Sequence, residues 1–438
     1  MSNVHLSGIA RDLAKFADNG KTIRIGVIGS GEMGTDLVTQ CMLMVGVEIS
    51  IIAARRPHTA LDAIKIAYGS DELGREVSNR KSMSETLDLG KIAITADPSL
   101  MVTAPEIDVV IDATGKPGVA ADYILLAMEH GKHIVMMNVE ADVTIGPYLR
   151  AQAERLGVIY SLGAGDEPSS CMELIEFASA LGYTIVSAGK GKNNPLKHDA
   201  VPDDFIEEAT RRNMNPRMLV EFIDGSKTAV EMAAIANATG LVPDVPGMHG
   251  PKASREELPS VLIPKQDGGV LNNIGVVDYT IGKGVAPGVF IIVKAEHPRI
   301  IERMDDLHVG SGPYYGFFRP YHLTSLEVPL TAARIMMYGK ADMVPLPNPV
   351  AEVCALAKRD IAAGETLDAI GETCYRSYTL KATDARAKKC LPVGLLEEGK
   401  ALRPIRKGEL ITALNAVPDT STLLYKMRSK QDEMLNLI

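Results

Sequence analysis

Short apolar runs of strand length alternate with helix-length segments over the first 165 residues. Continuous apolar runs of this length are typical of strands that are buried on both faces of a parallel sheet. Their alternation with helices predicts a doubly wound α/β sheet. Ile9, Leu13 and Phe16, at helical spacing, predict a leader helix that packs on this domain. The predicted strands are residues 23–28, 47–54, 91–95, 107–112, 132–138 and 158–162, and the predicted helices include 34–45, one or two within 55–90, and 119–129.

The first apolar run ends in a glycine-rich turn, residues 29–34, that reads G-x-G-x-x-G. In a strand–turn–helix context this is the Rossmann dinucleotide-binding fingerprint. Gly29 allows the tight turn, Gly31 lets the backbone approach a pyrophosphate, and Gly34 lets the helix pack close to the strand. The pyrophosphate is expected on the N-terminus of that helix.

The end of the second strand favours NADPH over NADH. NAD enzymes usually place an Asp or Glu there for the adenosine ribose, whereas this chain has Arg55 and Arg56, which suit a 2′-phosphate. A solvated pair of loop charges is the alternative. Later strand ends add further candidates, because ligands collect at the carboxyl ends of parallel strands. The predicted cofactor-binding residues are Gly29, Gly31, Glu32, Met33, Gly34, Arg55, Arg56, Thr114, Gly115, Asn138 and Gly165.

From about residue 171 the pattern changes to a helix, 171–181, and a strand, 184–188, followed by a loop, 189–195. That loop contains Lys190, Lys192, Asn193 and Asn194. Two cations and two amides at a strand end are suited to a phosphate, carboxylate or enolate oxygen. A solvated loop is the alternative, because lysines usually lie on surfaces.

A helix over residues 224–240 carries one charged pair among small apolar residues. Lys227 and Glu231 are four residues apart and therefore share a face. A charged pair in surroundings that look buried is costly as scaffolding. We therefore predict a functional role for both.

Residues 241–300 alternate short apolar runs with Pro- and Gly-rich turns, which predicts an open antiparallel or mixed sheet with strands at 261–264, 273–281 and 288–295. Residues 310–327 combine aromatic residues with glycines and prolines. This composition predicts an ordered loop of the kind that often carries function. Arg319, Tyr321 and His322 are expected to face a substrate, and a helix is predicted over 328–337.

The C-terminal part contains an internal repeat. Residues 359–367 and 403–411 share the pattern R-x-I-x-x-G-E-x-[LI], 44 residues apart, which predicts two similar strand–turn–strand units. Prolines 345, 347 and 349 mark a linker. The predicted domains are 1–165 for nucleotide binding, with the helix in 325–344 returning to it, 166–324 for catalysis and oligomerisation, and a small β-rich domain at 345–438.

The amino-acid composition limits the kinds of partner that this chain is expected to bind. Lysine and arginine number 46 against 55 acidic residues, a formal charge of −9, which argues against a general nucleic-acid binder. No apolar run approaches the ~20 residues of a membrane span. The five cysteines show no C-x-x-C spacing, and without a signal peptide they indicate a reducing cytoplasm.

The glycine loop, the K-G-K-N-N-P motif at 190–195, the P-Y-H-L motif at 320–323 and the duplicated R-x-I-x-x-G-E units together resemble the homoserine dehydrogenase-like oxidoreductases with a C-terminal SAF domain. The chain is most similar to the branch that resembles 1-deoxy-D-xylulose 5-phosphate reductoisomerase. The resemblance implies NADPH-dependent conversion of that sugar phosphate to 2-C-methyl-D-erythritol 4-phosphate in isoprenoid synthesis, in a homodimer or tetramer.

This reaction suggests roles for the candidates. Glu231 is the expected acid/base group, and Lys192 and Lys227 are expected to stabilise charge. The expected substrate ligands are Lys190, Asn193, Asn194, Arg319, Tyr321 and His322. Reductoisomerases outside this branch use a divalent metal held by carboxylates. Here either lysines replace the metal, or Asp166, Glu167 and Glu231 converge in the fold.

One departure argues against homoserine as the substrate. Homoserine dehydrogenases carry G-x-D-x-x-x-K where this chain has Gly225, Lys227 and Glu231 in the corresponding places, so acid and base are exchanged. Lys227 would repel an ammonium group and attract phosphate or an enolate. Two alternatives stay open: an NAD(P)-dependent sugar-acid oxidoisomerase or homoserine dehydrogenase-like dehydrogenase, and a nucleotide-sensing regulator without catalysis.

Overall fold

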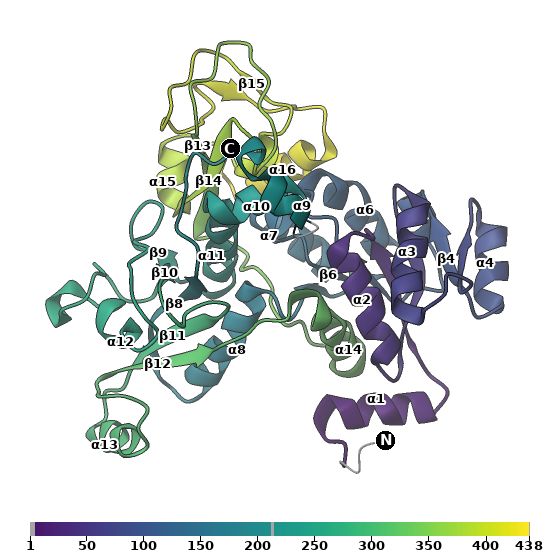
Figure 1. Ribbon diagram of the computed structural model, residues 1–438, viewed down its shortest axis with the longest axis horizontal. Coiled ribbons are helices and arrows are strands. Elements are labelled where there is room, and N and C mark those ends of the chain that lie inside the picture. The colour runs from purple at the N-terminus through teal and green to yellow at the C-terminus, as the bar shows by residue number, and fades with distance from the viewer. Residues whose placement is uncertain (1–4, 212–213, 438) are drawn as a thin grey trace. The chain divides into compact units, whose positions relative to one another are not determined.

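The computed structural model describes residues 5–211 and 214–437 (Figure 1). The chain forms two compact units. The first contains residues up to 142 with 148–166 and 323–344, and the second contains 143–147, 167–322 and 345–438. Among the described residues, no helix combines the length and the apolar character that crossing a membrane requires.

The first unit is built on a seven-stranded parallel sheet, which confirms the predicted doubly wound fold. Its strands are β1 (Ile23–Ile28), β2 (Val47–Ala53), β3 (Gly74–Glu76), β4 (Ile92–Thr95), β5 (Val109–Asp112), β6 (His133–Met136) and β7 (Tyr160–Leu162). The strand order is β3-β4-β2-β1-β5-β6-β7, so the chain reverses direction across the sheet beside β1. That switch point is where ligands of such sheets bind. The short strand β3 was not predicted.

Helices cover this sheet and bury its apolar strands. They are α1 (Gly8–Asp18), α2 (Glu32–Leu43), α3 (Pro57–Tyr68), α4 (Arg80–Asp88), α5 (Pro98–Val102), α6 (Pro117–Glu129), α7 (Val139–Leu156) and α14 (Val328–Tyr338). The predicted leader helix is confirmed as α1, whose Leu13 is buried in the core with Ile9 and Phe16 packed against it. Val328 and Ile335 of α14 belong to the same core, so a helix far along the chain completes it.

The second unit contains a five-stranded mixed sheet in the order β12-β11-β8-β10-β9. Its strands are β8 (Thr184–Lys192), β9 (Val242–Pro243), β10 (Val276–Ile281), β11 (Val289–Lys294) and β12 (Tyr314–Arg319). The helices of this part are α8 (Glu167–Ala180), α9 (Ile206–Arg211), α10 (Pro216–Ile223), α11 (Ser226–Thr239), α12 (Leu258–Val261) and α13 (Pro298–Asp306). Helices α8 and α11 both pack on β8.

Two predictions about this sheet are wrong. The expected strand at 261–264 is not present, because Leu258–Val261 form α12. The aromatic stretch expected to be a loop contains the edge strand β12, which pairs antiparallel with β11. Tyr314 and Tyr315 are buried there, so packing explains part of the aromatic density.

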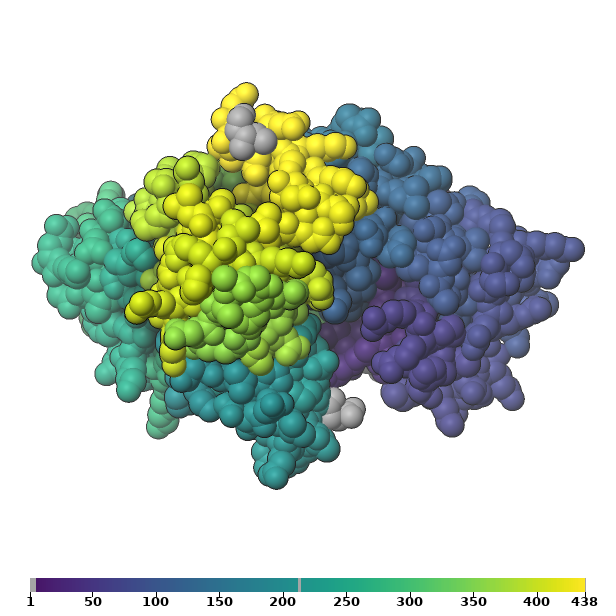
Figure 2. All heavy atoms as spheres, turned by 90° about the horizontal axis from the view of Figure 1, so that it is seen from above, coloured from purple at the N-terminus to yellow at the C-terminus, as the bar shows by residue number. Residues whose placement is uncertain are grey.

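The C-terminal residues group with the second unit. Their elements are β13 (Ala351–Ala357), β14 (Tyr375–Lys381), α15 (Ala382–Ala387), β15 (Lys400–Ala401), β16 (Ala416–Val417) and α16 (Leu423–Met434). Figure 1 shows α10 and α11 beside β13 and β14, and in Figure 2 the light green and yellow C-terminal residues border the teal residues near position 200. The assignment of 345–438 as an SAF-like domain stays a prediction.

The two copies of the repeat pair with each other. Ile361 and Ile405 exchange backbone hydrogen bonds of 2.8 and 2.9 Å. In each copy the Arg binds the Glu that follows the turn glycine: Arg359 reaches Glu365 at 2.5 Å and Arg403 reaches Glu409 at 2.6 Å. In each copy, isolated β-bridge residues lie on either side of a glycine turn, and neither 359–367 nor 403–411 contains a strand. The prediction of strand–turn–strand units was therefore wrong.

Candidate active site

Lys190 and Lys192 lie inside strand β8, not in a loop after it. Residues two apart in a strand share a face, so both ammonium groups project to the same side. Gly189 and Gly191, which alternate with the two lysines, explain why the strand was not recognised. A Cβ atom at Gly189 would lie 1.6 Å from the Asp278 carbonyl oxygen, and one at Gly191 would lie 1.9 Å from that of Val285. Only glycine fits where neighbouring backbone comes this close.

Lys190 joins two carboxylates in the interior of the second unit. Its Nζ donates to Glu167 Oε1 and to Glu231 Oε2, each at 2.5 Å. The three side chains are at most 8% exposed. Glu167 begins α8 and Glu231 lies in α11, so two helices and the central strand converge on this ammonium. The other oxygen of Glu231, Oε1, is buried without a hydrogen-bond partner.

Burial raises the pKa of Glu231 to about 7, and the nearby Glu167 carboxylate acts in the same direction, against the attraction of Lys190 and Lys227. Burial also lowers the pKa of Lys192 to about 8, with repulsion from Lys190 second. Burial opposes the charge of Lys190, but Glu167 and Glu231 outweigh it, so the pKa of Lys190 lies above its ordinary value. The cluster thus combines one permanent cation with an acid and a base that titrate near neutral pH, the range suited to proton transfer.

Other predicted residues surround this cluster to different degrees. Lys192 is buried and donates to the Phe222 carbonyl oxygen at 2.9 Å. Lys227 is partly buried in the first turn of α11, and its charge acts on Glu231. Asn193 and Asn194 directly follow β8, with Asn193 exposed and Asn194 partly exposed.

Arg319, Tyr321 and His322 lie at and beyond the end of β12. Arg319 donates to Ser170 Oγ at 2.7 Å and pairs with Glu173 at 3.2 Å, which ties it to α8. Its guanidinium stacks on the Tyr321 ring. His322 approaches the cluster, since its Nε2 is 3.5 Å from Glu167 Oε1. The structure therefore brings Lys190, Lys192, Glu231 and His322 together around Glu167.

Of the three carboxylates that the metal hypothesis expected to converge, Asp166, Glu167 and Glu231, the structure brings Glu167 and Glu231 together with an ammonium between them. A divalent cation at this point would have to displace Lys190 from both carboxylates and would leave it buried without a partner. The space between Glu167 and Glu231 therefore fits the lysine and does not fit a metal.

Comparison with known proteins agrees with this two-part organisation. Residues 25–162 match the family model of the homoserine dehydrogenase NAD-binding domain, and residues 165–328 match that of the catalytic domain of oxidoreductase DRL. The chain therefore combines an NAD-binding domain of the homoserine dehydrogenase type with a catalytic domain of the DRL type.

The individual relatives of this chain are distant. Homoserine dehydrogenase of Methylobacillus glycogenes is 31% identical over 27% of this chain, and that of Pseudomonas aeruginosa is 31% identical over 27%. The matched stretches span 25% and 21% of those relatives. A crystal structure of a probable dehydrogenase from Thermotoga maritima has 15% identity and a TM-score of 0.42, covering 73% of this chain and 90% of that one.

The nicotinamide cofactor of this oxidoreductase has a matching cradle in the first unit. Gly29 has a φ of 106°, and a Cβ at Gly34 would lie 2.3 Å from the Gly29 carbonyl oxygen, so the close approach of α2 to β1 demands glycine. A Cβ at Gly31 would meet no atom within 4 Å. Packing within the chain therefore does not require glycine at 31, whereas a bound pyrophosphate does. Glu32 and Met33 open α2.

The remaining cofactor candidates occupy strand ends as predicted. Thr114 Oγ1 and Asn138 Nδ2 both donate to the buried Asp112 carboxylate, at 2.6 and 3.1 Å. Arg55 and Arg56 are exposed directly after β2. Gly115 and Gly165 have positive φ, 61° and 88°. The cofactor and substrate roles of these positions stay predictions.

Sequence reasoning gave Glu167 only as a possible metal ligand, although it is the second partner of Lys190. Its signal in the sequence was its place at the start of a helix after a strand, where a carboxylate most often caps. The contact with Lys190 is set by α8 packing on β8, which no local pattern encodes.

Proposed function

We propose that the chain is an NADP-dependent reductoisomerase that converts 1-deoxy-D-xylulose 5-phosphate to 2-C-methyl-D-erythritol 4-phosphate. The observation that carries the proposal is the buried Glu167–Lys190–Glu231 cluster with Lys192 beside it. A fixed cation and a neutral-range acid/base pair suit a reaction that moves hydroxyl protons and forms an enolate.

The proposed rearrangement breaks the C3–C4 bond and forms a C2–C4 bond. Glu231 takes the proton of the C4 hydroxyl, the C3–C4 bond breaks to leave an aldehyde at C4, and its electrons pass to the enolate of the C2 ketone. Lys192 holds the enolate oxygen while the C3 hydroxyl proton passes to the C2 oxygen. C2 then attacks the C4 aldehyde, C3 becomes the new aldehyde, and Glu231 returns its proton to the C4 oxygen. Bound NADPH supplies the hydride that reduces the resulting aldehyde.

Selection of NADPH rests on Arg55 and Arg56. They follow β2, the strand whose end faces the adenosine ribose in this fold, and their exposure leaves them able to pair with a 2′-phosphate. An acidic residue there would favour NADH by binding the ribose hydroxyl groups. We therefore expect the chain to bind NADPH more tightly than NADH.

The test is NADPH oxidation by the purified chain on addition of 1-deoxy-D-xylulose 5-phosphate, with the product identified by mass spectrometry and NMR. Turnover to methylerythritol phosphate that is lost in Glu231→Gln and retained in Glu176→Gln supports the proposal. Glu176 is exposed on α8 and provides a matched control. No turnover refutes the proposal, and turnover of sugar acids alone would make the chain an oxidoisomerase.

A further inference from the structure

A polar cavity apart from the active-site cluster lies in the second unit, lined by residues of α11, β10, β14 and the loop at 246–249. Its volume is about 270 Å³. None of the lysines or glutamates of the active-site cluster lines it. Its lining includes His198, Thr228, His249, Tyr279, Arg376, Ser377 and Tyr378.

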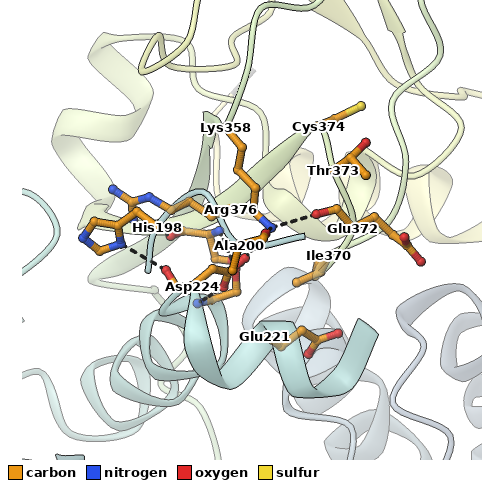
Figure 3. Close-up of polar contacts among 12 residues, drawn as sticks. His198, Ala200, Glu221, Asp224, Lys358, Ile370, Glu372, Thr373, Cys374 and Arg376 are labelled. Carbon is orange, nitrogen blue, oxygen red and sulfur yellow. Dashed lines mark hydrogen bonds and ion pairs between the residues drawn. The ribbon is translucent and has the colours of Figure 1, made fainter. Parts of the chain in front are cut away.

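Arg376 is the charged group of this cavity, and Figure 3 shows it extending from β14 toward His198. Over the described ranges 5–211 and 214–437, no carboxylate forms an ion pair with it. The carboxylate that acts on it most is Asp224, which is already bound by Lys358 at 2.7 Å. Burial lowers the pKa of Arg376 from its usual value. A partly buried guanidinium in this position lacks the anion that normally accompanies it.

Lys358 is fully engaged elsewhere and does not compete for a ligand. Its Nζ also donates to the carbonyl oxygens of Ala200, at 2.9 Å, and Glu372, at 2.7 Å (Figure 3). The Lys358–Asp224 pair is at most 1% exposed. It therefore acts as a structural support behind the cavity and leaves Arg376 as the available cation.

Two buried hydroxyl groups in the lining also lack partners. Thr228 Oγ1 and Ser377 Oγ are without hydrogen bonds, in residues that are 2% and 1% exposed. An unpartnered buried hydroxyl is costly unless something in the cavity satisfies it. Thr228 lies in the first turn of α11, where the helix dipole favours an anion. The Nδ1 of His198 is 3.2 Å from the Asp224 carbonyl oxygen, which holds the ring in place at the cavity.

The geometry of the lining is fixed from both sides. Ser377 N donates to Ser226 Oγ at 2.9 Å, and Thr379 Oγ1 donates to the Ala229 carbonyl oxygen at 2.7 Å, which locks β14 onto α11. Gly247 has a φ of 75°, and a Cβ there would lie 2.2 Å from the Tyr378 ring. The cavity is therefore a preformed site.

We propose that this cavity binds the phosphate group of a small phosphate ester, with Arg376 as the main ligand and the hydroxyl groups of Thr228 and Ser377 as further donors. A phosphate has enough acceptor oxygens for these donors together. The cavity and the active-site cluster lie on neighbouring strands, because Tyr279 in the cavity lining is the residue of β10 that pairs with Lys190 in β8. Resting on the proposed function, the inference assigns the phosphate of the substrate to Arg376 and leaves Lys190 and Lys192 for its oxygen-bearing carbons.

Calorimetric titration of the full chain with inorganic phosphate, at constant ionic strength and without cofactor, tests this site independently of turnover. Wild type is expected to bind phosphate. Arg376→Met should weaken binding at least tenfold, because a charge-assisted pair is lost. Arg386→Met is the matched control, since Arg386 is exposed on α15 outside the cavity, and it should bind as wild type does.

Thr228→Val separates binding from folding. The substitution keeps the shape and removes a hydroxyl that has no partner in the protein, so thermal stability should not fall while phosphate binding weakens severalfold. Undiminished phosphate binding in both Arg376→Met and Thr228→Val would overturn the proposal, as would an equal loss in Arg386→Met or tighter binding of acetate than of phosphate. If phosphate binds as described but 1-deoxy-D-xylulose 5-phosphate is not turned over, the site stands and the proposed reaction fails.

Discussion

Replacing Glu231 with glutamine removes a titrating carboxylate and keeps its shape. In the wild type, kcat/KM should rise as pH increases through about 7, because the base must lose its proton, and fall above about 8, as Lys192 loses its charge. The variant should lose the lower limb. Loss of a general acid/base costs about 10²–10⁴ in kcat, or about 3–5 kcal/mol in activation free energy.

The same substitution has an effect on stability that needs no substrate. The pKa of Glu231 is raised from 4.5 to about 7 on folding, so the folded state favours the protonated form. Its contribution to the free energy of unfolding is complete below pH 4.5 and is lost as pH rises through 7. The free energy lost over this range is about 3 kcal/mol. In Glu231→Gln the free energy of unfolding should therefore fall less between pH 5 and pH 8 than in wild type.

NADPH oxidation across pH 5.5–9 and urea unfolding at pH 5 and pH 8 measure the two effects. Glu176→Gln should match wild type in both assays. The reasoning is refuted if Glu231→Gln keeps the lower limb near pH 7 together with more than a tenth of the wild-type kcat. Unchanged pH dependence of unfolding would show that the carboxylate does not carry the raised pKa.

Four further variants test the active site and the cofactor cradle. Lys192→Met should remove the upper limb of the pH profile near pH 8, because that limb reports loss of its charge. Gly34→Ala should lower the free energy of unfolding by about 1–3 kcal/mol, measured by thermal denaturation, because the added Cβ overlaps the backbone. Gly31→Ala should unfold like wild type but bind NADPH more weakly, measured by nucleotide fluorescence. Arg55→Ala combined with Arg56→Ala should weaken NADPH binding about tenfold or more with little change for NADH; equal losses for both nucleotides would contradict the 2′-phosphate assignment.

The nucleotide-binding unit could be predicted from sequence because its signals are local. The apolar runs, the glycine turn after β1 and the helix that follows occur within a few residues of one another. The burial of α11 could also be predicted from the sequence, because small apolar residues surround Glu231 on every side of the helix.

The catalytic unit was harder because its decisive contacts join distant segments. Glycines 189 and 191 suggested a loop, yet they are required by the backbone of Asp278 and Val285, about 90 residues later in the chain. The pairing of Lys190 with Glu167 and Glu231 likewise depends on how two helices pack on one strand. The role proposed for Arg376 had no local signal in the sequence, because it depends on which carboxylates of the described residues lie near it in the fold.

The two copies of the C-terminal repeat each contain the same Arg–Glu ion pair, but the residues that neighbour the two pairs differ. Both Arg–Glu pairs have similar exposure, but Arg359 also reaches the sulfur of Cys374, at 3.3 Å. Glu409 in turn accepts from Asn415 Nδ2 at 3.3 Å. Double-mutant cycles on the two pairs would share every solution condition and the same global unfolding. Their difference would therefore measure how far these two neighbours, a thiol on one pair and an amide on the other, change the strength of a surface ion pair.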